Sequence, residues 1–198
     1  MKRTKFFKSI LLVGLIICAV QSYAQNSTDS TLKSVKWVNV GLGAFGSKEE
    51  ISGVGFELSW NEKHEQFLRK YRLLINSEVD LFGPSPSESY TSFAMLFGVP
   101  LDITEGFKLF GSMGGGLTYG VRRGNFKHSS GSFLSTDFYE KKHFVSPVIS
   151  FEVGFTAQPK KLPIGIGTTA YADLVFYRPL IGLSLALIVG NTRTDVLK

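Results

Sequence analysis

The sequence predicts an all-β fold, an eight-stranded antiparallel up-and-down transmembrane β-barrel. Three observations predict it. Large apolar residues alternate with small or polar residues along many segments, which is the period of an extended strand. These segments recur about eight times, and many reach the roughly ten residues of a tilted transmembrane strand. The connections between them alternate between short turns and longer polar segments, as in outer-membrane barrels.

The clearest pattern is the hairpin within Phe93–Arg122. Its first arm alternates large apolar residues with smaller ones. Its second arm alternates leucine, methionine, tyrosine and valine with glycine, serine and threonine. Pro100, Asp102 and Gly106 separate the arms and predict a tight turn. One face of this hairpin is therefore apolar, and the other is small or polar.

Six further segments follow the same rule. In the first of them, Trp37 falls among the polar positions, so it either plugs the barrel floor or is turned outward by a bulge. In the seventh strand, Asp173 fixes the polar face. The remaining expected strands are Lys36–Phe45, Ile51–Asn61, Phe67–Leu81, Phe144–Ala157, Ile164–Tyr177 and Leu180–Gly190.

The first 24 residues predict a secretory signal peptide. Met1–Lys8 is basic, Ile10–Val20 is apolar, and Ser22 and Ala24 supply the small residues before a cleavage site at Gln25. The alternatives are an uncleaved anchor and a lipoprotein leader acylated at Cys18. A flexible segment, residues 25–35, and one barrel domain, residues 36–192, are expected to follow.

The charge of the chain comes largely from this leader. The sequence has 22 basic and 16 acidic residues, and removing the leader's four basic residues leaves 18 − 16 = +2. A nucleic-acid partner is therefore not expected. The single cysteine, Cys18, also lies in the leader, so the mature chain has no disulfide, which is ordinary in a Gram-negative envelope. We expect the outer membrane as its location.

The apolar faces should point to lipid and the polar faces to a narrow, filled lumen. Charged groups inside must then be paired. Pairing across a turn at Glu62–Gln66 places Glu57 opposite Lys70, with Asn39 nearby. We therefore predict a lumen cluster and a possible second pair, the alternative being solvated charges at strand edges. The cluster is Asn39, Glu57, Lys70 and Arg72, and the second pair is Lys108 and Glu152.

Aromatic residues gather near the predicted strand ends, as in the interfacial girdles of membrane proteins. One girdle is expected at the periplasmic ends of the strands and one at the outer ends. The periplasmic set is Trp60, Tyr71, Phe97, Phe107 and Phe155, and the outer set is Phe82, Tyr90, Tyr119, Phe144, Phe176 and Tyr177.

The long polar segment Arg123–Lys142 is expected to be an external loop. It is basic and aromatic, so it could contact lipopolysaccharide phosphates or a protein partner, or it could be a solvated loop. The six residues singled out for such contacts are Arg122, Arg123, Phe126, Lys127, Phe133 and Tyr139.

Few residues suggest catalysis. The spacing of the three histidines predicts no metal or cofactor site. His128 and Ser130 have the His-x-Ser spacing of outer-membrane lipid A deacylases, with Glu140 as a speculative helper. The pair falls in a Gly/Ser-rich segment, where such residues are usually only solvated.

The chain resembles the small outer-membrane β-barrel domain family, the OmpA- and OmpX-like porin-type barrels. The resemblance rests on the leader, the eight alternating segments and the hairpin FGVPLDITEGFKLFGSMGGGLTYG. The chain departs from the family at its end, where Leu197-Lys198 replaces the usual terminal aromatic residue. The resemblance implies a barrel with a structural or interaction role, without catalysis or a wide pore. The alternatives are a lipid A-modifying enzyme and a soluble periplasmic, lipocalin-like barrel that binds an apolar ligand.

Overall fold

A computed structural model describes residues 34–47, 51–64, 67–79, 84–104, 106–129, 137–159, 162–190 and 192. The predicted signal peptide and residues 25–33 of the predicted flexible segment lie outside these ranges. Within them, no helix is both long enough and apolar enough to cross a bilayer.

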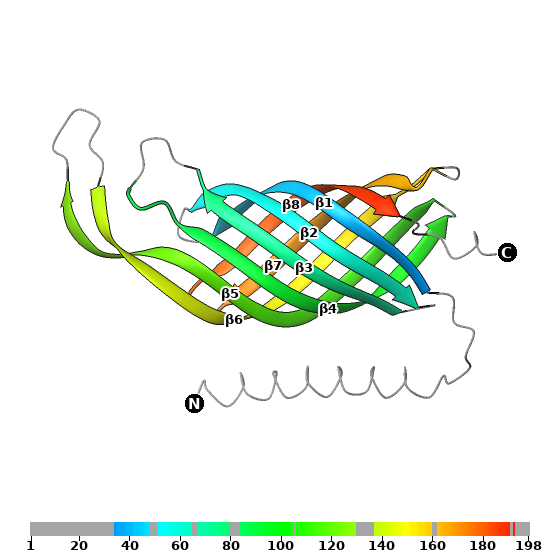
Figure 1. The fold of residues 1–198 in the computed structure, drawn as a ribbon, viewed down its shortest axis with the longest axis horizontal. Coiled ribbons are helices and arrows are strands. Elements are labelled where there is room, and N and C mark those ends of the chain that lie inside the picture. The colour runs from blue at the N-terminus through cyan, green and yellow to red at the C-terminus, as the bar shows by residue number, and fades with distance from the viewer. Residues whose placement is uncertain are drawn as a thin grey trace. The chain divides into compact units, whose positions relative to one another are not determined.

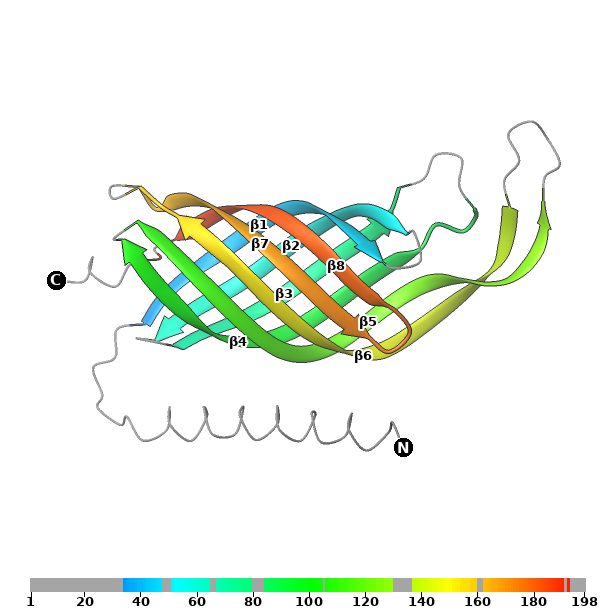
Figure 2. The same cartoon turned by 180° about the vertical axis from the view of Figure 1, so that it is seen from behind.

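The described chain is a closed antiparallel barrel in which each strand pairs with its sequence neighbours and β8 pairs with β1 (Figure 1, Figure 2). The prediction of an eight-stranded up-and-down barrel is confirmed. The strands are β1 (Ser34–Ser47), β2 (Ser52–His64), β3 (Phe67–Glu78), β4 (Ser89–Thr104), β5 (Phe107–Ser129), β6 (Asp137–Ala157), β7 (Ile164–Val175) and β8 (Pro179–Gly190).

The barrel has two distinct ends. We call the end where β1 begins and β8 stops the terminal end, and the opposite end the hairpin end. At the hairpin end β5 and β6 continue as a two-stranded ribbon that projects past the other strands (Figure 1). The prediction that Arg123–Lys142 is a loop is therefore wrong for most of that segment, because β5 extends to Ser129 and β6 starts at Asp137.

Cross-strand aromatic contacts explain the ribbon. Phe126 lies opposite Tyr139, with ring centroids 5.6 Å apart, and His128 stacks on Phe138 at 4.7 Å. Such pairs stabilise adjacent strands. Two register shifts between Arg123 and His128 increase the local twist. Because this segment is polar on both faces, its sequence shows no alternation that would predict the pairing.

The outer face of the barrel is apolar, as the alternation predicts. On β8, Leu183 and Leu185 are 56% and 63% exposed, whereas Leu180 and Ile188 on the inner face are fully buried. The lipocalin-like alternative required the apolar rows to converge on a central cavity, so it is wrong. Other outward apolar side chains are Val40, Leu42, Phe56, Leu58, Phe93, Val99, Leu117, Val145 and Val153.

The lumen is filled in layers. An apolar cluster near the terminal end, which we call the terminal plug, contains Val35, Trp37, Leu68 and Ile188, with Phe110 against it. Trp37 thus fills the barrel floor, the first of the two predicted options. A second cluster, the hairpin-end plug, consists of Phe45, Ile51, Leu74, Tyr90, Phe144, Val148, Tyr171, Val175 and Leu180.

The alternation predicts a small or polar inner face, and this prediction is incomplete. Along β3, Leu68 and Leu74 share the inward face with Lys70 and Arg72. The two leucines belong to the two plugs and the two cations lie between them. Apolar residues at inward-facing positions therefore cover the central charged layer on both sides.

Glycines let β4 and β5 approach closely inside the barrel. A Cβ atom at Gly116 would lie 1.9 Å from the Phe93 carbonyl oxygen, and one at Gly114 would lie 1.9 Å from that of Met95. At Gly111 on the same strand, a Cβ atom would have nothing within 4 Å. Close packing of β4 against β5 therefore requires glycine at positions 114 and 116 but not at position 111.

Candidate functional site

Five charged side chains from four strands meet in mid-lumen. Lys70 Nζ donates to Glu57 Oε1 at 2.7 Å and to Glu152 Oε2 at 2.8 Å. Arg72 donates from Nη1 to Glu152 at 2.8 Å and from Nη2 to Asp173 at 2.5 Å. We call Glu57, Lys70, Arg72, Glu152 and Asp173 the central ionic cluster. Its members are at most 3% exposed.

Hydroxyl groups and rings surround this cluster, while Arg72 Nε and Asp173 Oδ2 have no hydrogen-bond partner among the described residues. Ser184 donates to Glu57 at 2.6 Å, and Arg72 donates to Ser150 at 3.0 Å. Lys70 lies 5.8 Å from the Phe110 ring and Arg72 lies 5.4 Å from the Tyr171 ring, one ring from each side of the layer. Buried charges persist only when they are paired and hydrogen-bonded. The cluster therefore closes the lumen as a fixed ionic layer.

The structure brings together four of the six predicted lumen residues, but not through the predicted register. Glu57 lies opposite Leu74, and Lys70 lies opposite Asn61. The predicted pairing of Glu57 with Lys70 across the β2–β3 turn is wrong because β2 continues to His64, which moves the turn. Their side chains meet inside the lumen instead. Asp173 is a member that the sequence does not predict, although the alternation places it on the inward face of the seventh strand.

The other two predicted lumen residues lie elsewhere. Lys108 Nζ is 3.0 Å from Asp102 and also donates to the carbonyl of Thr192 at the terminal end. The predicted Lys108–Glu152 pair is therefore wrong. Asn39 is buried opposite Ser59 on β2, and within the described part of the chain its Oδ1 has no hydrogen-bond partner.

A second set of charges lies at the hairpin end, which we call the hairpin-end charge cluster. Arg123 pairs with Glu78 at 2.5 Å and with Glu88 at 3.6 Å, and Arg178 pairs with Glu88 at 2.6 Å. The Tyr90 hydroxyl donates to Glu88. Glu88 thus connects β5 with the β7–β8 connection. Of these residues the sequence predicts only Arg123, as a contact residue, and Tyr90, as a girdle aromatic. The girdle assignment of Tyr90 is wrong, because its ring is buried in the hairpin-end plug.

The segment before β4 is held against the ribbon. Ser85 donates its N–H to the Asp137 carbonyl at 2.8 Å and accepts from the Tyr139 N–H at 2.7 Å. Arg123 also donates to the Pro84 carbonyl at 3.4 Å. The β3–β4 connection, the ribbon and the β7–β8 connection therefore form one hydrogen-bonded structure at this end.

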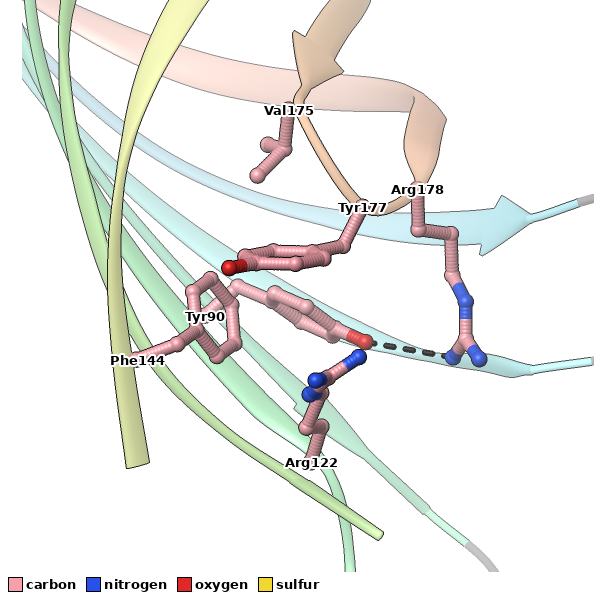
Figure 3. Close-up of a pocket in the computed structure, with 6 residues that line it drawn as sticks. All are labelled: Tyr90, Arg122, Phe144, Val175, Tyr177 and Arg178. Atoms are coloured by element: carbon pink, nitrogen blue, oxygen red, sulfur yellow. Dashed lines mark hydrogen bonds between the residues drawn. The ribbon is translucent and has the colours of Figure 1, made fainter. Parts of the chain in front are cut away.

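A cavity of about 110 Å³ opens beside this cluster. Its lining combines aromatic rings with two guanidinium groups (Figure 3). The Arg122 guanidinium lies 4.5 Å from the Tyr177 ring centroid, and Arg178 donates to the Tyr90 hydroxyl at 3.2 Å. The lining residues are Tyr90, Arg122, Phe144, Val175, Tyr177 and Arg178.

The remaining predicted contact residues are spread along the ribbon. Phe126 and Lys127 are exposed, and Tyr139 is half-buried. Phe133 and Ser130 lie outside the described residues. The components suggested for catalysis have other contacts: His128 stacks on Phe138, and Glu140 Oε2 is 3.3 Å from Lys142.

Comparison with known proteins shows the fold. No protein-family model and no curated protein matches the sequence. Neisserial surface protein A (NspA) matches with a TM-score of 0.59 and 10% identity, over 80% of this chain and 97% of that one. Ail, the attachment invasion locus protein of Yersinia pestis, was solved with the heparin analogue sucrose octasulfate. It matches with a TM-score of 0.53 and 10% identity, over 79% and 96%. The chain has the fold of small eight-stranded outer-membrane β-barrels.

Proposed function

We propose that this protein is a non-catalytic outer-membrane barrel that presents its hairpin end at the cell surface for interaction. The observation that carries the proposal is the distribution of its side chains. Large apolar residues are exposed around the outside, and ionised residues are buried within. Lipid is the solvent that such an exterior requires, and a closed barrel leaves no unpaired backbone in it.

The filled lumen supports a role other than solute conduction. The central ionic cluster spans β2, β3, β6 and β7, and an apolar plug lies on each side of it. An eight-stranded barrel encloses just enough space for such side chains. We therefore propose that the barrel acts as an anchor for the structure at its hairpin end.

The charge of the β5–β6 ribbon and its connection supports contact with anionic partners. Residues 122–142 contain five Lys or Arg and two Asp or Glu, a net charge of 5 − 2 = +3. Phosphate groups of lipopolysaccharide are the anions nearest to the outer surface of such a barrel, and arginine binds them well. The structure of Ail with a heparin analogue shows that a barrel of this fold can bind an anionic saccharide.

The predicted leader is consistent with this location. Cleavage before Gln25 would release a mature chain that begins nine residues before β1. The two longest connections, β3–β4 and β5–β6, lie at the hairpin end, where β5 and β6 also project, and this matches the usual asymmetry between the periplasmic and outer sides. We propose that the terminal end faces the periplasm.

Cell fractionation followed by unheated and heated SDS gels tests the proposal. A folded outer-membrane barrel stays in the membrane fraction and migrates differently before and after boiling. Protease added to whole cells should cleave within the β5–β6 connection and leave the terminal end intact. Release of the protein by osmotic shock, with no change in gel mobility on boiling, would contradict the proposal.

A further inference from the structure

The cavity at the hairpin end contains an arginine whose charge is not matched. Arg122 contacts the Tyr177 ring, and among the described residues no carboxylate hydrogen-bonds or pairs with it. Its cross-strand neighbour is Lys142, which is itself cationic. The other guanidinium in the cavity, Arg178, is by contrast paired with Glu88 at 2.6 Å.

Aromatic rings surround this arginine. Tyr177 packs edge-on against Phe144 at 5.6 Å, and Phe144 packs against Tyr90 at 5.9 Å. Tyr90 and Phe144 are at most 9% exposed and form a firm floor, whereas Tyr177 is 49% exposed and borders the opening. Arg122 and Arg178 both point toward the hydroxyl end of Tyr90 (Figure 3). The cavity therefore combines a rigid aromatic wall with the Arg122 guanidinium, which has no carboxylate partner among the described residues.

We propose that this cavity binds the phosphate or sulfate monoester of a sugar. The ester oxygens would accept hydrogen bonds from Arg122, whose planar guanidinium suits a tetrahedral oxyanion. The C–H face of the sugar ring would lie against Tyr177. A volume of about 110 Å³ has room for the ester group, with the ring at the opening. This inference deepens the proposed function and rests on it only in assuming that the hairpin end faces the exterior.

The net charge of +3 on residues 122–142 attracts anions to this segment, but it does not select one position. The specific claim is that Arg122 holds the ester, while Lys127, exposed farther along the ribbon, does not. The two residues carry the same charge on the same strand, so Lys127→Gln is a matched control for Arg122→Gln.

Binding is measured by calorimetry on the folded full chain in zwitterionic micelles at about 0.15 M salt, where diffuse charge effects are screened. The probes are glucose 6-phosphate, glucose 6-sulfate and glucose. We expect saturable binding of both esters and none of glucose. Arg122→Gln should weaken binding at least tenfold, which corresponds to about 1.4 kcal/mol, and Lys127→Gln should change it less than twofold.

Tyr177→Leu provides a second variant if Arg122→Gln fails to fold, and it should weaken binding about threefold or more, as expected from losing one aromatic contact. To separate the two sources of the ester, the titration is repeated in nanodiscs that contain monophosphoryl lipid A. Competition by the lipid identifies a lipid-borne phosphate as the occupant, and unchanged affinity identifies a soluble saccharide.

Absence of saturable ester binding, or equal losses in Arg122→Gln and Lys127→Gln, would overturn the proposal. Neither result depends on where the protein is located in the cell. Failure of the cavity can therefore be distinguished from failure of the proposed outer-membrane role.

Discussion

The central ionic cluster and the hairpin-end charge cluster use the same residue types in different surroundings. In the centre, the side chains of Lys70, Arg72 and Glu152 are completely buried. At the hairpin end, Arg123 and Arg178 retain 13% and 17% of their side-chain exposure. The first cluster is fixed by mid-strand positions, and the second joins strand ends to connections.

This difference in burial assigns the two clusters different roles, stability in the centre and binding at the hairpin end. Removing one partner of a fully buried pair leaves an uncompensated charge, so the centre tolerates little change. Partly hydrated ion pairs at the hairpin end contribute less free energy, so they can be broken and re-formed at lower cost. A site that exchanges its own ion pairs for contacts to a ligand needs this property. We therefore expect substitutions to act mainly on folding in the centre and mainly on the ordering of the strand ends and connections at the hairpin end.

The largest effect is expected from Glu57→Lys. This change places a second cation beside Lys70 and removes the acceptor of the Ser184 hydroxyl. A loss of about 3–5 kcal/mol or more in the free energy of unfolding is expected for a broken buried pair. Urea titration, followed by the change in gel mobility on boiling, measures it. Unchanged stability would show that the centre does not depend on charge pairing.

A smaller effect is expected from Glu88→Gln. The change weakens the contacts to Arg123, Arg178 and Tyr90, and hydrogen bonds to charged groups contribute about 1.5–3 kcal/mol. Hydrogen exchange should become faster in residues 84–88 and in the ribbon, while β3 and β8 keep their protection. Equal acceleration in the centre would break the distinction between the two clusters.

Gly116→Ala tests whether packing alone accounts for the sensitivity of the barrel wall. The added methyl group would meet the Phe93 carbonyl oxygen, and overpacking of this kind costs about 1–3 kcal/mol. Gly111→Ala is the matched control, since its methyl group has open space. If the two variants unfold at the same urea concentration, the close approach of β4 and β5 does not limit which residues the barrel wall tolerates.

The smallest effect is expected from Lys36→Gln at the terminal end. Lys36 lies 3.2 Å from Glu62 but its side chain is 51% exposed, and such pairs contribute about 0–1 kcal/mol. The urea midpoint should move little, and the small shift should vanish in high salt. A loss as large as that of Glu88→Gln would mean that exposure does not rank these pairs.

Alternation alone predicted the strands and their faces, because a period of two assigns each side chain to one side of the sheet. It could not predict which strands face each other across the lumen. Arg72 on β3 meets Asp173 on β7, 101 residues away, through barrel closure and side-chain length. The unpredicted membership of Asp173 follows from this limit. Lys108 instead pairs with its cross-strand neighbour Asp102, because β4 continues to Thr104 through residues that predict a turn.

Turn position was the other limit. The polar stretch Glu62–Gln66 predicts a turn after β2, yet β2 continues through Glu62 and Lys63 to His64. Likewise, polar residues of the ribbon hid an extension of β5 and β6. Where β5 and β6 project past the other strands, neither face needs to be apolar, so the sequence shows no alternation there. The candidate cavity could not be predicted from the sequence for the same reason, because strand ends form its lining.

The central claim is that the apolar rows face lipid and the charges lie inside. Methyl NMR of the folded full chain in nanodiscs with a paramagnetic lipid tests it without any substitution. Leu183 and Leu185, which are 56% and 63% exposed, should lose their methyl signals, whereas Leu180 and Ile188 on the same strand should keep theirs. The reverse pattern, or no signal loss at Leu183 and Leu185, would contradict the account.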